Sequence, residues 1–342
     1  MTQTPFELGP IRPVAEARSL LIRTTRGCPW NQCDFCVNYQ DMPFSIRRVD
    51  EIERDIAAAA DYYGAHPFTS CFLQDGDSFL MKTRDLLRVL RCIREHFPHL
   101  ERITSYGRAA TMVRRSPEEM RELAEAGLNR LYCGMESGCD AVLERIHKGV
   151  TAADIVRAGL LAKEAGMEIS EFLIVGLGGR ELWEAHARDT ARALNEIDAD
   201  FIRVRTIGVK IGSRLEAARE RGEYELQTET ELVREQRLLL EGLEGVTGYY
   251  SNDHAVNLLM EVEGRLMQDK ERLLGLLDRY LDLPEAERDL YNVGRRLNTF
   301  GALDDLEDPG RRAAAAQQAQ QIEDRYPGMR EEVCHHLRER VV

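Results

Sequence analysis

Three cysteines, Cys28, Cys33 and Cys36, stand close together near the start of the chain. They follow an apolar run, residues 20–25, that is typical of a buried strand. Thiolates are the soft ligands that iron–sulfur clusters prefer, and this spacing allows one loop to surround a cluster. Three protein ligands leave one iron of a [4Fe–4S] cube open to bind another molecule. The sequence therefore predicts a metal centre with these three ligands.

A zinc site is the alternative interpretation of the same cysteines. Structural zinc needs four ligands, and the fourth would come from Cys71, Cys139 or a histidine. The chain has eight cysteines, and without a secretion signal a disulfide framework is not expected. We expect Cys71, Cys92, Cys133 and Cys334 to be small core thiols. Cys139 is a candidate catalytic residue, because its loop is expected to face the site.

Short apolar runs alternate with helical patterns through the first part of the chain. The predicted strands are residues 20–25, 71–74, 103–106, 130–134, 169–175 and 201–207. Capping signals predict helices that begin at Asp50, Ser116 and Thr151. Strands alternating with helices imply βαβ units and a parallel sheet. Six units are too few for a closed eight-fold barrel, so an open partial barrel and a doubly wound sheet both fit the pattern.

The pattern changes after about residue 222. Residues 223–342 are highly charged and helical in pattern, with an irregular stretch at 245–252 and no convincing strand. We therefore expect an N-terminal segment at 1–17, a main domain at 18–222 and a helical extension at 223–342. His254 is a candidate acid, base or substrate contact, and the alternative is a capped surface histidine. His335 and His336 are expected to be solvated.

The cysteine segment resembles the signature of the radical S-adenosylmethionine (SAM) superfamily, C-x3-C-x2-C with an aromatic residue before the last cysteine. Phe35 occupies the aromatic place, and one extra residue separates Cys28 from Cys33. The resemblance implies an α/β fold, a six-unit partial TIM barrel, (β/α)6, followed by the helical extension. It also implies a [4Fe–4S] cluster held by the three cysteines, with SAM bound at the carboxyl ends of the strands.

Two later segments resemble SAM contacts of the superfamily. Gly76 and Asp77 stand where a Gly-Gly-Glu type motif binds the amino group of SAM, and the alternative is an ordinary Asp-Gly turn. Glu136 and Lys148 match a segment shared by methylthiotransferases and oxygen-independent coproporphyrinogen oxidases. In those families the two places contact the ribose and the carboxylate of SAM. Otherwise, Lys148 is a solvated lysine beside a capping glycine.

The fifth predicted strand ends in a glycine-rich turn that resembles the adenine-contacting turn of the superfamily. Its first glycine is Gly176, and glycine there also permits close packing of a strand and a helix. Related families often carry a ribose-binding acid four residues earlier. Phe172 holds that place here, so Glu171, one position off, is the candidate substitute.

Polar residues also mark two other strand ends. Arg203 and Arg205 are two apart in a strand and share a face, where they could bind a carboxylate or phosphate. The alternative is an ion pair with Glu171 or another structural acid. Ser105 and Arg108, at the end of the third strand, form a similar candidate group.

Charge and hydropathy limit the function. The chain has 59 acidic and 46 basic residues and a formal charge of −13, which argues against wrapping nucleic acid. Its longest apolar runs have the length of strands, so no membrane segment is expected. The first residues lack the features of a signal peptide, which predicts a cytoplasmic protein.

The resemblance implies that SAM is cleaved reductively to a 5′-deoxyadenosyl radical, which abstracts hydrogen from a small, anionic metabolite. A one-electron donor such as flavodoxin or ferredoxin would be the protein partner. Two other classes stay open. One is a haem or cluster chaperone with the same fold and no radical chemistry, and the other is a zinc-stabilised α/β binding protein.

Overall fold

The computed structural model describes residues 4–64 and 68–340. Residues 1–3, 65–67 and 341–342 lie outside the described part. The predicted ranges 1–17 and 223–342 are therefore described only from residue 4 and up to residue 340. The chain forms two compact units. The first unit comprises Met1–Met135 and Gly149–Glu171, and the second comprises Glu136–Lys148 and Phe172–Val342.

Parallel strands form the centre of the first unit. Their hydrogen-bonded order is β1 (Leu20–Arg23), β4 (Ser70–Gln74), β5 (Arg102–Tyr106), β6 (Leu128–Glu136) and the first half of β7 (Glu168–Val175). All five residues of β4 are buried, as expected for a strand covered on both faces. A small antiparallel pair, β2 (Thr25–Arg26) and β3 (Ser45–Ile46), follows β1. The predicted strands of this unit are therefore confirmed.

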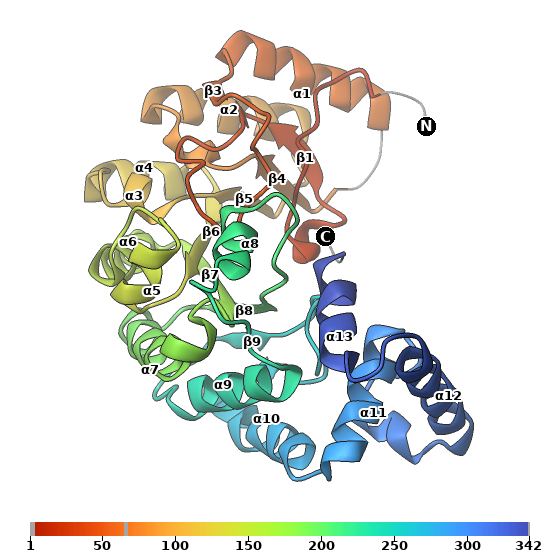
Figure 1. Cartoon of the computed structure of the whole chain (residues 1–342). Coiled ribbons are helices and arrows are strands. Elements are labelled where there is room, and N and C mark those ends of the chain that lie inside the picture. The colour runs from red at the N-terminus through yellow and green to blue at the C-terminus, as the bar shows by residue number, and fades with distance from the viewer. Residues whose placement is uncertain (1–3, 65–67, 341–342) are drawn as a thin grey trace. The chain divides into compact units, whose positions relative to one another are not determined.

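Helices alternate with these strands (Figure 1). They are η1 (Val14–Glu16), α1 (Val49–Tyr63), η2 (Ser78–Leu80), α2 (Thr83–His96), α3 (Ala109–Met112), α4 (Pro117–Glu125) and α6 (Ala152–Glu164). Ser116 and Thr151 both form the predicted capping boxes. The prediction that Asp50 caps α1 is wrong, because the N-cap is Arg48 and the Asp50 carboxylate instead pairs with its guanidinium at 3.0 Å.

The strands of the second unit continue from the second half of β7. Their order is β7, β8 (Phe201–Thr206), β9 (Tyr249–Ser251) and β10 (Gly264–Arg265). β9 pairs parallel to β8 and antiparallel to β10. The prediction of an irregular stretch at 245–252 without a strand is therefore wrong. A strand of three residues is too short to show an alternating pattern, and only its partner strands reveal it.

The remaining helices belong to the second unit. They are α5 (Asp140–Arg145), α7 (Gly179–Ile197), α8 (Arg214–Glu220), α9 (Glu229–Glu241), α10 (Leu266–Leu281), α11 (Glu285–Arg296), η3 (Leu303–Glu307), α12 (Pro309–Arg325) and α13 (Arg330–Glu339). Figure 1 shows α11, α12 and α13 side by side in the blue part of the ribbon. Within the described residues, no helix is long and apolar enough to span a membrane. The α/β fold with a mostly parallel sheet is confirmed.

A buried ion cluster joins three of these helices. Glu229, the first residue of α9, is 2.7 Å from the Arg296 guanidinium of α11 and 2.9 Å from that of Arg338 in α13. All three side chains are almost completely inaccessible to solvent. Burial alone would raise the pKa of Glu229, but the two guanidinium groups hold it at about 2. We call these residues the Glu229 cluster.

Candidate functional site

The three predicted cluster ligands lie on one loop of the first unit, between β2 and β3. Cys28, Cys33 and Cys36 are half-buried, and none forms a disulfide. The Cys36 amide donates to the Cys33 carbonyl at 3.1 Å, which forms a turn at the end of this segment. One short loop thus carries all three thiols, and its last part is held by a backbone turn.

The turn after β4 binds the start of this loop. The Asp75 carboxylate accepts hydrogen bonds from Arg23 Nε at 2.7 Å and from the Gly27 amide at 3.3 Å. The Gly76 amide donates to the Gly27 carbonyl at 3.2 Å, and a Cβ on Gly76 would lie 2.8 Å from that oxygen. Asp75 also has a φ of +96°, in the left-handed region that only a few residue types tolerate. A fixed backbone thus supports the cysteine loop.

Cysteine thiolates are the usual ligands of iron–sulfur clusters, in which each cysteine binds a different iron. A structural zinc site instead needs four ligands around one ion. Within residues 4–64 and 68–340, no group of three or more Cys, His, Asp or Glu side chains is arranged to hold a single metal ion.

Asp77, the predicted contact for the SAM amino group, is buried and already bound. Its carboxylate accepts a hydrogen bond from the Thr111 hydroxyl and a weaker one, at 3.4 Å, from the Arg108 amide. Burial raises the pKa of Asp77 to about 6, although these donors oppose the shift. The structure thus gives this carboxylate a role in connecting the turn after β4 to the start of α3.

The other candidates of the first unit lie near strand ends. Arg108 places its guanidinium 5.4 Å from the ring centroid of Trp30 in the cysteine loop, and Phe35 is half-buried in the same loop. The Ser105 hydroxyl donates to the Tyr106 carbonyl at 2.9 Å. Glu171 is completely buried within β7.

In the second unit, Glu136 and Lys148 form an ion pair of 2.9 Å. Only 13% and 11% of the two side chains is exposed. Glu136 has a φ of +61° at the last position of β6, a conformation that is uncommon for residues other than glycine. The spacing of twelve residues therefore brings these two predicted SAM contacts together.

Side chains from later parts of the sequence hold the turn that follows β7. The buried Gly176 amide donates to Glu235 of α9 at 2.8 Å, and the Gly176 carbonyl accepts from the Tyr224 hydroxyl at 2.7 Å. Glu235 Oε1 is also 2.8 Å from Nδ1 of His186 in α7. The sequence analysis missed Tyr224, Glu235 and His186, because no local motif connects them to the turn.

Basic side chains gather at and after β8. Arg203 is buried 3.8 Å from Asp253, and the Arg205 guanidinium lies 5.3 Å from the ring centroid of Phe172. Within the described chain, Arg205 forms no ion pair. Burial lowers the pKa of His254 to about 4, and the positive charge of Arg205 adds to the effect.

Three histidines and one cysteine singled out from the sequence differ in burial. The alternative that His254 is a surface residue is wrong, because the side chain is buried and its Nδ1 accepts from the Val256 amide. The prediction of a solvated His335 is also wrong, since it packs inward 2.8 Å from Glu339, whereas His336 is exposed as predicted. Cys139 is buried, and burial raises its thiol pKa.

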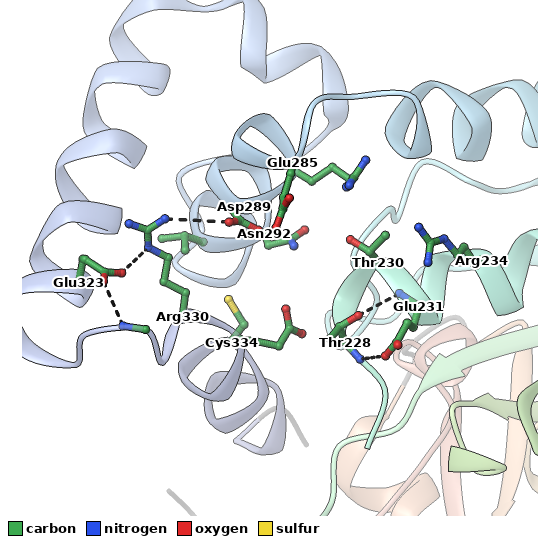
Figure 2. A pocket seen from close by; sticks show the side chains of 14 residues that line it. Thr228, Thr230, Glu231, Arg234, Glu285, Asp289, Asn292, Glu323, Arg330 and Cys334 are labelled. Atoms are coloured by element: carbon green, nitrogen blue, oxygen red, sulfur yellow. Dashed lines mark hydrogen bonds and ion pairs between the residues drawn. The ribbon is translucent and has the colours of Figure 1, made fainter. Parts of the chain in front are cut away.

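A separate cavity of about 470 Å³ lies among the helices that end the second unit (Figure 2). Burial raises the pKa of Glu331 to about 7, and the nearby Glu229 carboxylate adds to the shift. None of the residues predicted as site residues from the sequence lines this cavity. The residues that do are Thr228, Thr230, Glu231, Arg234, Glu285, Arg288, Asp289, Asn292, Val293, Glu323, Gly328, Arg330, Glu331 and Cys334.

A family model and a known relative both match part of this chain. Residues 22–191 match the model of the radical SAM superfamily. An uncharacterized methyltransferase of Pyrococcus horikoshii is 25% identical over 196 residues, which cover 57% of this chain and 40% of the relative.

Two solved structures extend the comparison. The cobalamin-dependent S-adenosylmethionine radical enzyme OxsB matches with a TM-score of 0.52 at 12% identity, covering 93% of this chain and 58% of that one. Methylornithine synthase matches with a TM-score of 0.48 at 18% identity, covering 66% and 63%. The chain therefore spans less than two thirds of each of these relatives, and the likeness to OxsB shows the fold alone.

Proposed function

Because this chain belongs to the radical SAM superfamily, whose members use a [4Fe–4S] cluster and SAM, we propose that it abstracts hydrogen from a small, anionic metabolite. When bound and reduced by a one-electron donor, the cluster would supply the electron for the reductive cleavage of SAM. The observation that carries this proposal is the single loop that brings Cys28, Cys33 and Cys36 together outside any disulfide, supported by the turn after β4.

The chain's own residues would bind the two partners of this reaction. Cys28, Cys33 and Cys36 would hold the cluster. In the second unit, Glu136 would accept from the SAM ribose, and Lys148 would pair with the SAM carboxylate. These two side chains form an ion pair in this structure, and SAM would give Lys148 a carboxylate and Glu136 a ribose hydroxyl donor in its place.

The basic group at β8 supports an anionic substrate. Arg205 lies on an aromatic ring and has no ion-pair partner in the described chain, so an anion would supply one. Arg203 shares its face of the strand and is restrained by Asp253 at 3.8 Å. His254 would be neutral at physiological pH, and because its Nδ1 accepts from the Val256 amide, its Nε2–H could donate one hydrogen bond.

Anaerobic reconstitution with iron and sulfide tests the proposal. We expect the wild-type protein to gain iron–sulfur absorption and to form 5′-deoxyadenosine from SAM with dithionite. Cys33→Ala should do neither, whereas Cys92→Ala, a change of a cysteine on α2, should behave like the wild type. Deoxyadenosine formation by Cys33→Ala would overturn the assignment.

The same assay separates the alternatives. A chaperone would bind SAM without forming deoxyadenosine, and a zinc protein would show no iron–sulfur absorption. The name of the Pyrococcus relative makes S-adenosylhomocysteine a further product to measure. If it accumulated in place of deoxyadenosine, methyl transfer would replace hydrogen abstraction as the function.

The anionic substrate is tested with phosphate as a probe. We expect phosphate to raise the melting temperature of the wild type more than that of Arg205→Met. Arg188→Met is the matched control, because Arg188 is an exposed arginine of α7 in the same unit. An equal phosphate response of wild type and Arg205→Met would remove the argument for an anionic substrate.

A further inference from the structure

We infer that Tyr224, Glu235 and His186 are positioning residues for SAM, which hold the turn at Gly176 and the strand end at Glu136 in the conformation that binds it. This inference rests on the proposed function, in which those two segments contact SAM. All three side chains are almost completely buried, so they act through the segments that they hold and not by direct contact with solvent or ligand.

Both backbone groups of Gly176 depend on these side chains. β7 ends at Val175, so Gly176 lies beyond the last residue of the strand, and it is buried away from water. A buried amide or carbonyl without a partner is costly. Glu235 accepts from the amide at 2.8 Å, and the Tyr224 hydroxyl donates to the carbonyl at 2.7 Å.

The packing around Gly176 leaves no room for a side chain at this position. Its φ is +96°, and a Cβ there would lie 2.4 Å from Ile207 and 2.6 Å from Leu232. Leu232 precedes Glu235 on α9, so one helix supplies both the steric contact and the hydrogen-bond acceptor. The position of this helix therefore determines the position of the turn.

His186 connects the turn to the other candidate segment. Its Nδ1 is 2.8 Å from Glu235 Oε1, and its Nε2 is 3.3 Å from the backbone carbonyl of Glu136. That carbonyl belongs to a residue with a φ of +61°, a conformation that surrounding contacts must maintain. A continuous series of polar contacts thus runs from Gly176 through Glu235 and His186 to Glu136.

Residues after 222 would take part in binding SAM. Tyr224 and Glu235 both lie in the range that the sequence predicts as a separate helical extension. If they position the SAM contacts, the first helix of that range is part of the cofactor site. A protein ending at residue 222 would lack the partners of both backbone groups of Gly176.

Variants of the reconstituted full chain test this role by SAM affinity, measured by equilibrium dialysis. For Glu235→Ala we expect about 10-fold to 100-fold weaker SAM binding, the range found when a partner that orients a ligating group is removed. Tyr224→Phe removes a single hydroxyl, and we expect a smaller loss. Glu235→Gln keeps an acceptor for the Gly176 amide, and its affinity should lie between those of Glu235→Ala and the wild type.

Two controls separate positioning from general damage. Glu241→Ala changes an exposed glutamate of the same helix and should leave SAM affinity unchanged. Iron content should equal that of the wild type in every variant, because the cysteine loop belongs to the first unit.

The outcomes distinguish this inference from the proposed function. If the wild type does not bind SAM, the proposed function fails. If the wild type binds SAM and folded Glu235→Ala and Tyr224→Phe bind it equally well, only the positioning role is refuted. Should Glu235→Ala fail to fold, Tyr224→Phe and Glu235→Gln still decide the question, because each preserves the volume of the side chain.

Discussion

Asp75→Asn tests whether the turn after β4 supports the cysteine loop. The Asp75 side chain is completely buried, and it pairs with Arg23, whose side chain is 8% exposed. Asparagine has the same shape, tolerates the φ of +96° and still offers an oxygen to the Gly27 amide. The substitution therefore removes the negative charge and little else.

The expected cost follows from the burial of this pair. Removing one partner of a buried ion pair costs about 3–5 kcal/mol, because the other charge stays buried. Arg23 keeps a second carboxylate, Glu7, at 2.8 Å, so we expect the lower end, about 3 kcal/mol. For a unit of this size that corresponds to a fall in melting temperature of roughly 6–12 °C.

Urea unfolding followed by tryptophan fluorescence measures this cost. The chain has two tryptophans, Trp30 in the cysteine loop and Trp183 in α7, so a Trp183→Phe background reports on the loop. We expect Asp75→Asn to unfold at lower urea and to bind less iron on reconstitution. Asp50→Asn, which changes an exposed ion pair, should leave the urea midpoint almost unchanged. Equal stability and equal iron content of Asp75→Asn and wild type would refute the reasoning.

Three further predictions concern contacts that lie within one unit or the other. Gly76→Ala should lower the iron bound per chain, because the added Cβ would lie 2.8 Å from the Gly27 carbonyl; iron content like that of the wild type would contradict this. The raised pKa of Glu331, about 7, means that its contribution to stability is complete below pH 4.5 and is lost as the pH rises through 7. Glu331→Gln should therefore be more stable than the wild type above pH 7, by about 2 kcal/mol after allowance for partial exposure, and equally stable below pH 4.5; a pH-independent difference in urea unfolding would refute this. Lys148→Met leaves Glu136 without its ammonium partner, and we expect a loss of about 3 kcal/mol in urea unfolding together with weaker SAM binding, whereas an unchanged urea midpoint would show that the pair is not needed.

Local sequence determined the features that could be predicted. The capping boxes at Ser116 and Thr151 each involve residues three apart, and the structure contains both. The six apolar runs form strands for the same reason, since each is a short local segment of mostly apolar residues. The three cysteines share a loop because they are close in the chain, and the pairing of Glu136 with Lys148 spans only twelve residues.

Contacts between distant residues could not be predicted in this way. Glu235 binds the Gly176 amide across 59 positions, and no periodicity or motif signals such a contact. β9 exists only because β8 and β10 offer it hydrogen bonds. The burial of His254 and His335 likewise depends on which segments cover them, and a polar local sequence does not reveal that.

The Glu229 cluster has a consequence for how the second unit folds during synthesis. Glu229 leaves the ribosome long before Arg296, which is 67 positions further along, and Arg338 follows later still. Until both guanidinium groups are present, the carboxylate lacks the charges that make its burial favourable. The start of α9 would therefore remain solvated until α13 has emerged, and the nascent chain would complete this unit in a single late step. Pulse-labelled hydrogen exchange should accordingly show α9, α11 and α13 gaining protection together.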